Sequence, residues 1–156
     1  MNETTLKTSD MKQYIVVNIG NEQFGIDIKY VDNIVRMQRI TRVPKAQPYF
    51  NGVINIRGEI IPVMSLRVKL ELEPDVFTSK TRILIIKLEP QSAVGIIVDE
   101  VKNVITLSDE DIDMNTTTGN DDKAIYTTGV GKMETGLVTL LNLQGVIVEK
   151  ESVEKV

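Results

Sequence analysis

The sequence predicts a mainly β fold that is built from two similar small units. Short apolar runs rich in valine and isoleucine recur along the chain, and glycine, proline and asparagine separate them, as turns separate strands. The stretch at residues 52–66 contains two such runs around Arg57-Gly58-Glu59, and the order of the runs repeats in the second half of the chain. Strands of about five to eight residues at regular spacing are typical of small barrels.

Length and composition indicate an ordinary globular protein. The chain has 156 residues, of which 42% are hydrophobic and 26% charged, enough for one domain or two small ones that share a core. No apolar run approaches the roughly 18 residues of a membrane helix, and residues 1–11 are polar, unlike a signal peptide. We therefore expect a cytoplasmic protein without direct membrane insertion.

Composition also excludes several kinds of chemistry. The chain contains no histidine and no cysteine, so Ser-His-Asp and Cys-His catalysis and the usual zinc sites cannot exist. Residues 128–133 look like a phosphate loop, but the required Gly and Ser or Thr positions hold Tyr126 and Met133. We expect no catalysis, no cofactor and no metal.

The first half of the chain begins with two predicted strands, residues 14–19 and 23–26, around a turn. Asp27 can cap a short helical segment that follows. This segment is predicted because apolar residues recur at helical spacing, at Ile28, Val31, Ile34 and Val35. A basic connector, residues 36–45, then leads to the stretch at residues 52–66.

That stretch reads as a hairpin with strands at residues 53–56 and 60–64. Gly58 suits the first position of a two-residue Gly-Glu loop, because glycine tolerates positive φ. Pro62 cannot donate to a ladder, so the second strand is expected to be an edge or bulged. Arg57 is either a solvated turn residue or an anchor for a partner, since arginine at an ordered turn is common in interfaces.

The second half is expected to repeat this organisation after a linker at residues 66–78. Residues 108–122 form a polar, acidic loop in which Ser108 starts a helical turn. Asn142 can cap a C-terminal helix from Leu143 onward. Strands are predicted at residues 81–88 and 93–98, residues 101–107 are a further apolar segment, and residues 124–133 and 136–141 are predicted to form a second hairpin.

An internal repeat accounts for the similarity of the halves. Residues 24–35 align with 94–105 at an offset of 70, and residues 52–66 align with 129–143 at an offset of 77. Each unit would be too small for a good core alone, so the two would pack together or exchange elements. Short strands at this spacing suit SH3-like barrels. The matched positions include Gly25 and Gly95, Ile28 and Val98, Val31 and Val101, and Asn33 and Asn103.

The matched apolar pairs bear on function. Near a pseudo-twofold axis, Val31 and Val101 would line a seam between the two units. They are either core residues or an exposed apolar groove for a partner helix.

Several stretches resemble the CheW-type chemotaxis coupling proteins, and the resemblance covers residues 13–143. In combination these stretches are specific: residues 24–28, 40–44, 52–58 with 61–63, and 94–99. The resemblance implies two five-stranded SH3-like barrels packed together, with short helical segments and a C-terminal helix. Residues 1–12 would be a flexible tail and residues 149–156 a frayed end. The domain between them, residues 13–148, would consist of pseudo-repeat halves at about 13–75 and 79–148.

The resemblance also implies a role. Such proteins are non-enzymatic adaptors that join the cytoplasmic helical hairpin of chemoreceptors to the regulatory domain of the chemotaxis histidine kinase, at membrane-associated receptor arrays. The positions that match the receptor groove are Ile15, Ile28, Val31 and Val101, and Arg57 matches a residue that is important for coupling. Gly52, Gly58 and Gly95 match glycines that support the backbone. Asn33 stands where some family members carry an acid, so no charge pairing is carried over there.

Three other functions remain open from the sequence. A detached regulatory domain of a kinase would have the same fold, but the chain carries no kinase or receiver motifs. A small-barrel nucleic-acid-binding module is disfavoured by the net charge of −4 and by 4% aromatic residues, so we expect no nucleic acid as partner. An enzyme that uses carboxylates would require an enclosed cleft with facing acids, for which the sequence has no signal.

Overall fold

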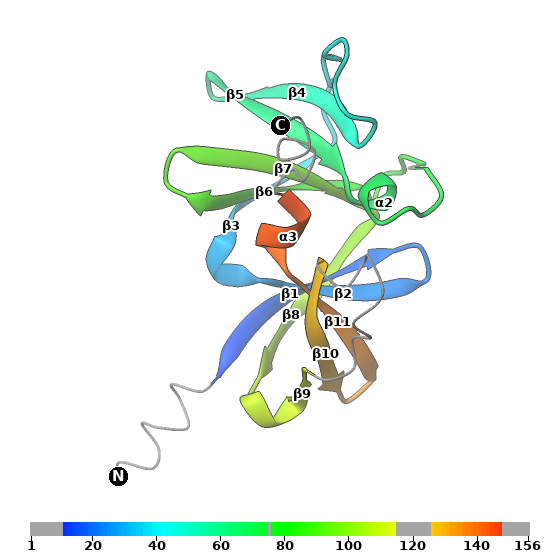
Figure 1. Cartoon of the computed structure of the whole chain (residues 1–156), viewed down its shortest axis with the longest axis vertical. Coiled ribbons are helices and arrows are strands. Elements are labelled where there is room, and N and C mark those ends of the chain that lie inside the picture. The colour runs from blue at the N-terminus through cyan, green and yellow to red at the C-terminus, as the bar shows by residue number, and fades with distance from the viewer. Residues whose placement is uncertain (1–10, 75, 115–125, 148–156) are drawn as a thin grey trace, which may run out of the picture.

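The computed structural model describes residues 11–74, 76–114 and 126–147, which form two β-sheets and a few short helices (Figure 1). Within these residues, no helix is both long and apolar enough to cross a membrane. The strands are β1 (Lys12–Ile19), β2 (Glu22–Asp27), β3 (Val31–Arg36), β4 (Phe50–Ile56), β5 (Glu59–Ser65), β6 (Arg82–Glu89), β7 (Ser92–Val98), β8 (Glu100–Leu107), β9 (Ile112–Asp113), β10 (Thr127–Met133) and β11 (Gly136–Leu141). The helices are η1 (Ile28–Tyr30), α2 (Leu66–Lys69), η2 (Asp109–Asp111) and α3 (Leu143–Ile147).

The two sheets have the same internal order of strands. One sheet has the order β8-β1-β2-β11-β10-β9 and the other the order β3-β6-β7-β5-β4. In both, a parallel contact joins two antiparallel hairpins, β11 with β2 and β5 with β7. The mainly β fold class, with short helices and a C-terminal helix, is confirmed, and the two-residue strand β9 makes one sheet six-stranded.

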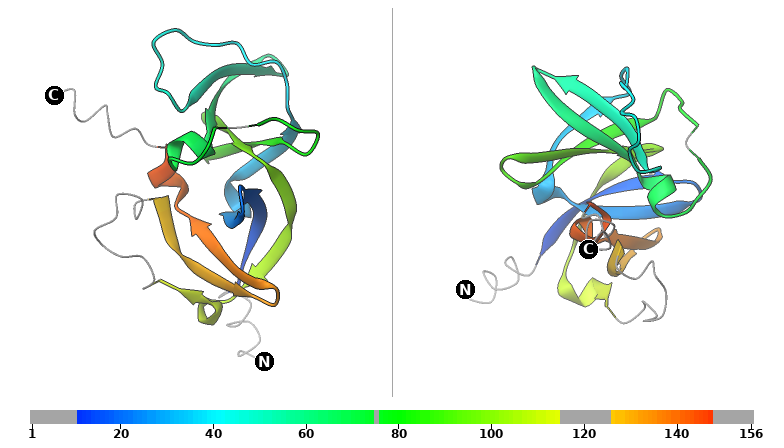
Figure 2. Two further views of the ribbon diagram at one scale, coloured as in Figure 1. Left: turned by 90° about the vertical axis from the view of Figure 1, so that its right-hand side faces the viewer. Right: turned by 45° about the horizontal axis from the view of Figure 1, so that its top comes forward.

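Each sheet takes strands from both halves of the chain. The N-terminal hairpin β1–β2 lies in the sheet that contains β8 to β11, whereas the hairpin β6–β7 lies in the sheet that contains β3 to β5. Two further views also show the β4–β5 hairpin at one end of the molecule and β9 at the other (Figure 2). The repeat and the domain boundaries drawn from it stay predictions. Residues 1–10 and 148–156, at the expected flexible ends, lie outside the described residues.

Three apolar clusters explain why the strand sequences are almost continuously hydrophobic. In β1, Ile15 and Val17 enter a central cluster between the sheets, while Tyr14 and Val16 enter the cluster of the six-stranded sheet. In β6, Leu84 and Ile86 join the central cluster, and the alternate residues join that of the five-stranded sheet. A strand that is buried on both faces has no polar side and therefore reads as an unbroken apolar run.

The predicted helical segment after Asp27 is much shorter than the spacing of apolar residues indicated. The Asp27 carboxylate accepts a hydrogen bond from the Lys29 N–H at 3.1 Å, but only η1 is helical. Residues Val31–Arg36 form strand β3, which pairs antiparallel with β6. Pairing with a neighbouring strand overrides a helical pattern that rested on β-branched residues.

Two other helical predictions are confirmed, and one helix was not predicted. Helix α3 begins at Leu143, as predicted. Ser108 and Asp111 form a capping box at η2, as expected of a helical turn at Ser108. The linker at residues 66–78 is wrong in part, because it begins with helix α2, whose Ser65 hydroxyl accepts from the Val68 N–H at 3.2 Å.

The hairpin turn lies one residue earlier than predicted. Ile56 pairs with Glu59, so the two-residue loop is Arg57-Gly58 rather than Gly58-Glu59. Both residues have positive φ, 54° and 87°, as a type I′ turn requires. The Asn55 side chain accepts the Gly58 N–H at 2.9 Å and closes the turn.

Pro62 predicted an edge strand or a bulge in β5. The strand is not an edge, and its pairing with β4 has an irregular register opposite Val63 and Met64, next to Pro62. It lies between β4 and β7 in the sheet. Its ladder with β7, however, covers only Val63 to Ser65. Pro62 lies just beyond that ladder, where a missing N–H costs no hydrogen bond with β7.

Candidate functional site

Three of the four predicted groove residues lie half-buried at the junction of the two sheets. Ile28, Val31 and Val101 pack from η1, β3 and β8 against the central cluster, and we call these three residues the junction surface. Ile15 is only 4% exposed and belongs to that cluster itself. The structure therefore brings all four residues together, with Ile15 beneath the surface rather than on it.

The junction surface draws on both sheets in an equivalent manner. Val31 pairs with Ile86 at the edge of one sheet, and Val101 pairs with Val17 at the edge of the other. Val31 directly follows η1, which leads from β2 in one sheet to β3 in the other, and Val101 is the second residue of β8, just after Asp99 connects the sheets in the reverse direction. A partner that contacts both valines thus contacts both sheets.

An ion pair fixes the second of these connections. The Asp99 carboxylate accepts from Arg67 Nη2 at 2.6 Å and Nε at 3.0 Å, and from the Gly20 N–H at 2.8 Å. The Asp99 N–H donates to the Asn18 carbonyl at 3.0 Å. These contacts tie α2, the β1–β2 turn and the β7–β8 connection together.

The ion pair also perturbs the ionisation of Asp99. Burial would raise the pKa of this carboxyl, but the hydrogen bonds from Arg67 and Gly20 and the positive charge of Arg67 hold it below its usual value. Neither side chain is fully shielded, with 17% of Arg67 and 28% of Asp99 exposed. The pair therefore fixes the position of the β7–β8 connection against α2, and its contribution to the free energy of unfolding is modest.

The β4–β5 hairpin tip presents Arg57 beside an exposed aliphatic side chain. Ile60 is 60% exposed, whereas Ile61 on the opposite face of the strand is only 2% exposed. Arg57 is exposed and forms no ion pair or hydrogen bond through its side chain with any other described residue. Cation and aliphatic surface are thus both available to a partner at one tip.

The three predicted structural glycines have different environments. Gly52 has φ of 141°, and a Cβ there would collide with the Thr41 carbonyl. At Gly95 a Cβ would come within 2.8 Å of Ile83 Cγ2 and 3.3 Å of Val63 Cγ2. Gly58 has open space around it, so only its positive φ demands glycine.

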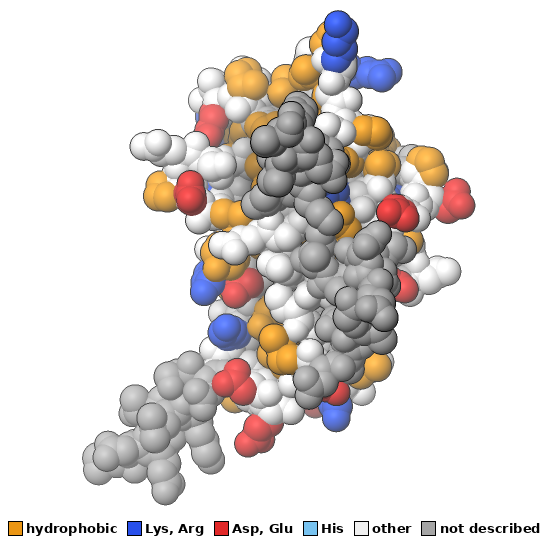
Figure 3. Space-filling view, in the orientation of Figure 1, with side chains coloured by type: hydrophobic (Ala, Val, Ile, Leu, Met, Phe, Trp, Pro, Cys, Tyr) orange, Lys and Arg blue, Asp and Glu red, His pale blue; other side chains and the backbone are white. Residues whose placement is uncertain are grey.

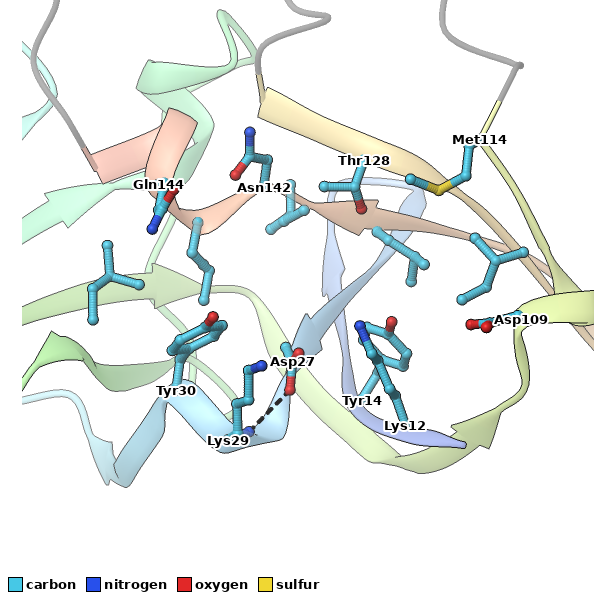
Figure 4. Close-up of a pocket in the computed structure, with 15 residues that line it drawn as sticks. Lys12, Tyr14, Asp27, Lys29, Tyr30, Asp109, Met114, Thr128, Asn142 and Gln144 are labelled. Atoms are coloured by element: carbon cyan, nitrogen blue, oxygen red, sulfur yellow. Dashed lines mark hydrogen bonds between the residues drawn. The ribbon is translucent and has the colours of Figure 1, made fainter. Parts of the chain in front are cut away.

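A cavity of about 480 Å³ lies beside α3, between η1 and η2 (Figure 4). Two lysines, two aspartates and two tyrosines line it, namely Lys12, Lys29, Asp27, Asp109, Tyr14 and Tyr30. Burial raises the pKa of the Tyr14 phenol, and the charges of Asp27 and Asp109 raise it further. The phenol stays protonated at neutral pH, so it cannot serve as a general base there.

Sequence reasoning missed Arg67 and Ile60. Arg67 stands 32 positions from its partner Asp99, and only the fold brings the two together. Ile60 lies within a continuous apolar run, and the sequence does not reveal which residues of that run face solvent. In β5 the residues at the hairpin tip, Glu59 and Ile60, are exposed and those from Ile61 onward are largely buried, and this boundary follows only from the folded structure.

Comparison with known proteins assigns the family. The model of the CheW-like domain matches residues 13–151. Chemotaxis protein CheW of Bacillus subtilis is 34% identical over 147 residues, which cover 94% of this chain and 92% of that protein. Chemotaxis protein CheW of Helicobacter pylori is 33% identical over 138 residues, which cover 88% and 82%.

The fold agrees with a solved structure. The crystal structure of the scaffolding protein TtCheW from Thermoanaerobacter tengcongensis superposes with a TM-score of 0.79 at 27% identity, covering 89% of this chain and 94% of that one. Such a scaffold has chemotaxis signalling proteins as its partners. The chain belongs to the CheW family, and it is a non-catalytic scaffolding and coupling protein of chemotaxis signalling.

Proposed function

We propose that the protein couples the cytoplasmic helical hairpin of a chemoreceptor to the regulatory domain of a chemotaxis histidine kinase, in the cytoplasm at membrane-associated receptor arrays. The observation that carries this proposal is the junction surface, where Ile28, Val31 and Val101 are half-exposed over the central cluster. A helix lays an apolar stripe into such a surface, and residues from both sheets would flank it. Ile15 supports the surface from below.

The kinase regulatory domain is assigned to the β4–β5 hairpin tip. This tip is at one end of the molecule, away from the junction surface, so both partners can bind at once (Figure 1). Ile60 supplies an exposed apolar contact and Arg57 a cation that is free to pair with an acid of the kinase. One protein can thus bridge two partners without any catalytic step.

Calorimetric titration with each partner separately tests this assignment. We expect saturable one-to-one binding to the isolated regulatory domain of a chemotaxis kinase and to a receptor-tip fragment. The substitutions Val31→Asp and Val101→Asp should abolish binding of the receptor fragment while binding of the kinase domain is retained. Loss of binding to both partners together would indicate unfolding. The near-isosteric variants Val31→Thr and Val101→Thr therefore serve as a milder pair.

Two results would contradict the proposal. One is unchanged receptor binding by all four valine variants in proteins with a native circular dichroism spectrum. The other is absence of binding to the kinase domain at any accessible concentration by the wild-type chain.

A further inference from the structure

The connector between β3 and β4 carries an uninterrupted positive charge. From residue 33 to residue 58 the chain contains five arginines and lysines and no acid, although its net charge is −4. Four of these cations, Arg36, Arg39, Arg42 and Lys45, are exposed on or beside the connector, and none forms an ion pair with another described residue. Lys and Arg side chains gather accordingly at the end of the molecule where this connector projects (Figure 3).

Two adjoining cavities lie under the connector. The first has a volume of about 380 Å³ and is lined by Arg42, Lys45 and Asn51 among others. The second has a volume of about 210 Å³ and an apolar lining that includes Val43, Phe50 and Pro62. Val43 and Phe50 line both cavities, so the polar cavity lies directly beside the apolar one.

A buried acceptor in the first cavity lacks a donor. Asn51 Oδ1 is inaccessible to solvent and accepts no hydrogen bond from any described residue. A buried carbonyl oxygen without a partner is costly and uncommon in folded proteins. The connector beside it is also held in an unusual conformation, because Lys45 has φ of 64° without being glycine.

From the positive charge of the connector and the two cavities we infer that the β3–β4 connector, residues 37–49, is a separate binding site for an acidic, extended protein segment that carries one aliphatic side chain. Acids of the segment face Arg42 and Lys45, and its aliphatic side chain enters the cavity at Phe50 and Pro62. The inference goes beyond the proposed coupling of receptor and kinase and is tested without either of them.

The chemistry favours a protein segment over a phosphate or a nucleic acid. A phosphate offers oxygens to the cations but no apolar group for the cavity at Phe50 and Pro62, whereas a protein segment offers both acids and an aliphatic side chain. The second cavity is lined by aliphatic side chains, Pro62 and Phe50, and suits a leucine or valine better than a charged sugar. Three cations on one short connector, with Arg36 beside it, also fall well short of the extended basic face of nucleic-acid binders.

The test is a nuclear magnetic resonance titration of the ¹⁵N-labelled full chain with the probe peptide acetyl-Asp-Asp-Glu-Leu-Asp-Glu-amide. We expect saturable shifts of amide signals confined to the connector and the cavity lining, residues 37–53. Raising the salt concentration from about 50 to about 300 mM should weaken binding about fivefold, because exposed charges are screened. Replacing the leucine of the probe by serine should weaken it about threefold or more.

Matched variants locate the site. Arg42→Glu combined with Lys45→Glu should weaken binding at least about tenfold, since two attractive charges become repulsive. Lys102→Glu combined with Lys132→Glu makes the same change of net charge at exposed positions of β8 and β10 and should leave binding unchanged. Val43→Ser should weaken binding without changing charge.

Several outcomes would overturn the inference. Equal losses in both double variants would mean that net charge alone attracts the probe. Tighter binding of a single-stranded oligonucleotide, or equal effects of inorganic phosphate at the same amides, would assign the site to phosphate groups. The same amide shifts on raising the protein concentration without peptide would identify a second copy of the chain as the occupant. Absence of saturable shifts would remove the site altogether.

Discussion

At the scale of single residues, left-handed backbone marks two of the candidate binding positions. Arg57, Lys45 and Glu71 have positive φ without being glycine. Each such residue costs of the order of 1–3 kcal/mol and persists only where its surroundings hold it. Arg57 is held by the two-residue turn and by Asn55, and both Arg57 and Lys45 carry exposed cations.

Substitutions at Arg57 can distinguish the stability of the hairpin from its role in coupling. Arg57→Asn creates Asn-Gly, the preferred type I′ pair, and should stabilise the protein by about 0.5–1 kcal/mol because asparagine tolerates positive φ. Arg57→Ala should keep the fold without this gain. Urea denaturation measures the stability, and both variants should weaken the coupling of receptor to kinase. Wild-type coupling in either variant, with its fold intact, would show that the charge of Arg57 is not used.

Asp99 should make stability depend on acidity. Because its pKa is lowered in the folded protein, the ionised carboxylate stabilises the fold above the ordinary carboxyl pKa, and this contribution is lost as pH falls through the lowered value. Asp99→Asn should cost about 1–2 kcal/mol at pH 7, given the partial exposure of the ion pair.

Chemical denaturation between neutral pH and about pH 3 checks the sign, since carboxylates titrate in this range. The difference between wild type and Asp99→Asn should shrink towards acid. Asp32→Asn, at an exposed position, is the control. A difference that is the same at every pH would mean that the Asp99 charge contributes nothing.

At the scale of elements, the two hairpin tips are equivalent and both expose an aliphatic residue. Ile60 on the β4–β5 hairpin is 60% exposed, and Leu137 on the β10–β11 hairpin is 65% exposed. The two residues occupy the same place in the predicted repeat. Neither contributes much to folding, because burial is what makes an aliphatic side chain stabilising.

Serine substitutions at the two tips test which hairpin meets the kinase. Ile60→Ser and Leu137→Ser should each change the free energy of unfolding by less than about 0.5 kcal/mol. Ile60→Ser should weaken binding of the kinase regulatory domain about tenfold, as loss of an interface anchor does. Leu137→Ser is the matched control and should bind normally in calorimetry. The reverse result would move the kinase contact to the β10–β11 tip.

At the scale of the whole molecule, the two sheets are inseparable. Each contains strands from both halves of the chain, and the central cluster takes side chains from both sheets. Buried Lys69 adds a polar contact to this interior, with its Nζ 3.8 Å from the ring centre of Tyr49. Neither half can complete a sheet by itself.

If the chain is cut in two, neither fragment should fold alone, and mixing the two fragments should restore the fold. Circular dichroism should show that fragments 1–75 and 76–156 are each unfolded alone. Each fragment contains only some of the strands of either sheet. Mixing them should restore the β spectrum and a cooperative thermal transition. A folded spectrum of either fragment alone would show that a half is an autonomous domain.

The sequence determined most of the strands, but not β3 or β9. The β-branched runs at β1, β6, β7 and β11 and the start of α3 could be read directly, because apolar runs and caps are local signals. Strand β3 could not, since its pairing with β6 decided its conformation. The turn at Arg57-Gly58 shifted by one residue, because register depends on which face of the strand is buried.

The candidate site divides in the same manner. From the sequence alone came the family resemblance, the matched valines Val31 and Val101, and the prediction, carried over from that resemblance, that Arg57 takes part in coupling. Tertiary structure alone decided that Ile15 is buried, that Arg67 reaches Asp99, and that Ile60 faces solvent. Strand and turn signals depend on residues that are close in the sequence, so the sequence reveals them. The exposure of a side chain and the pairing of distant residues are decided only when each sheet takes hairpins from both halves of the chain and the sheets close over a shared core.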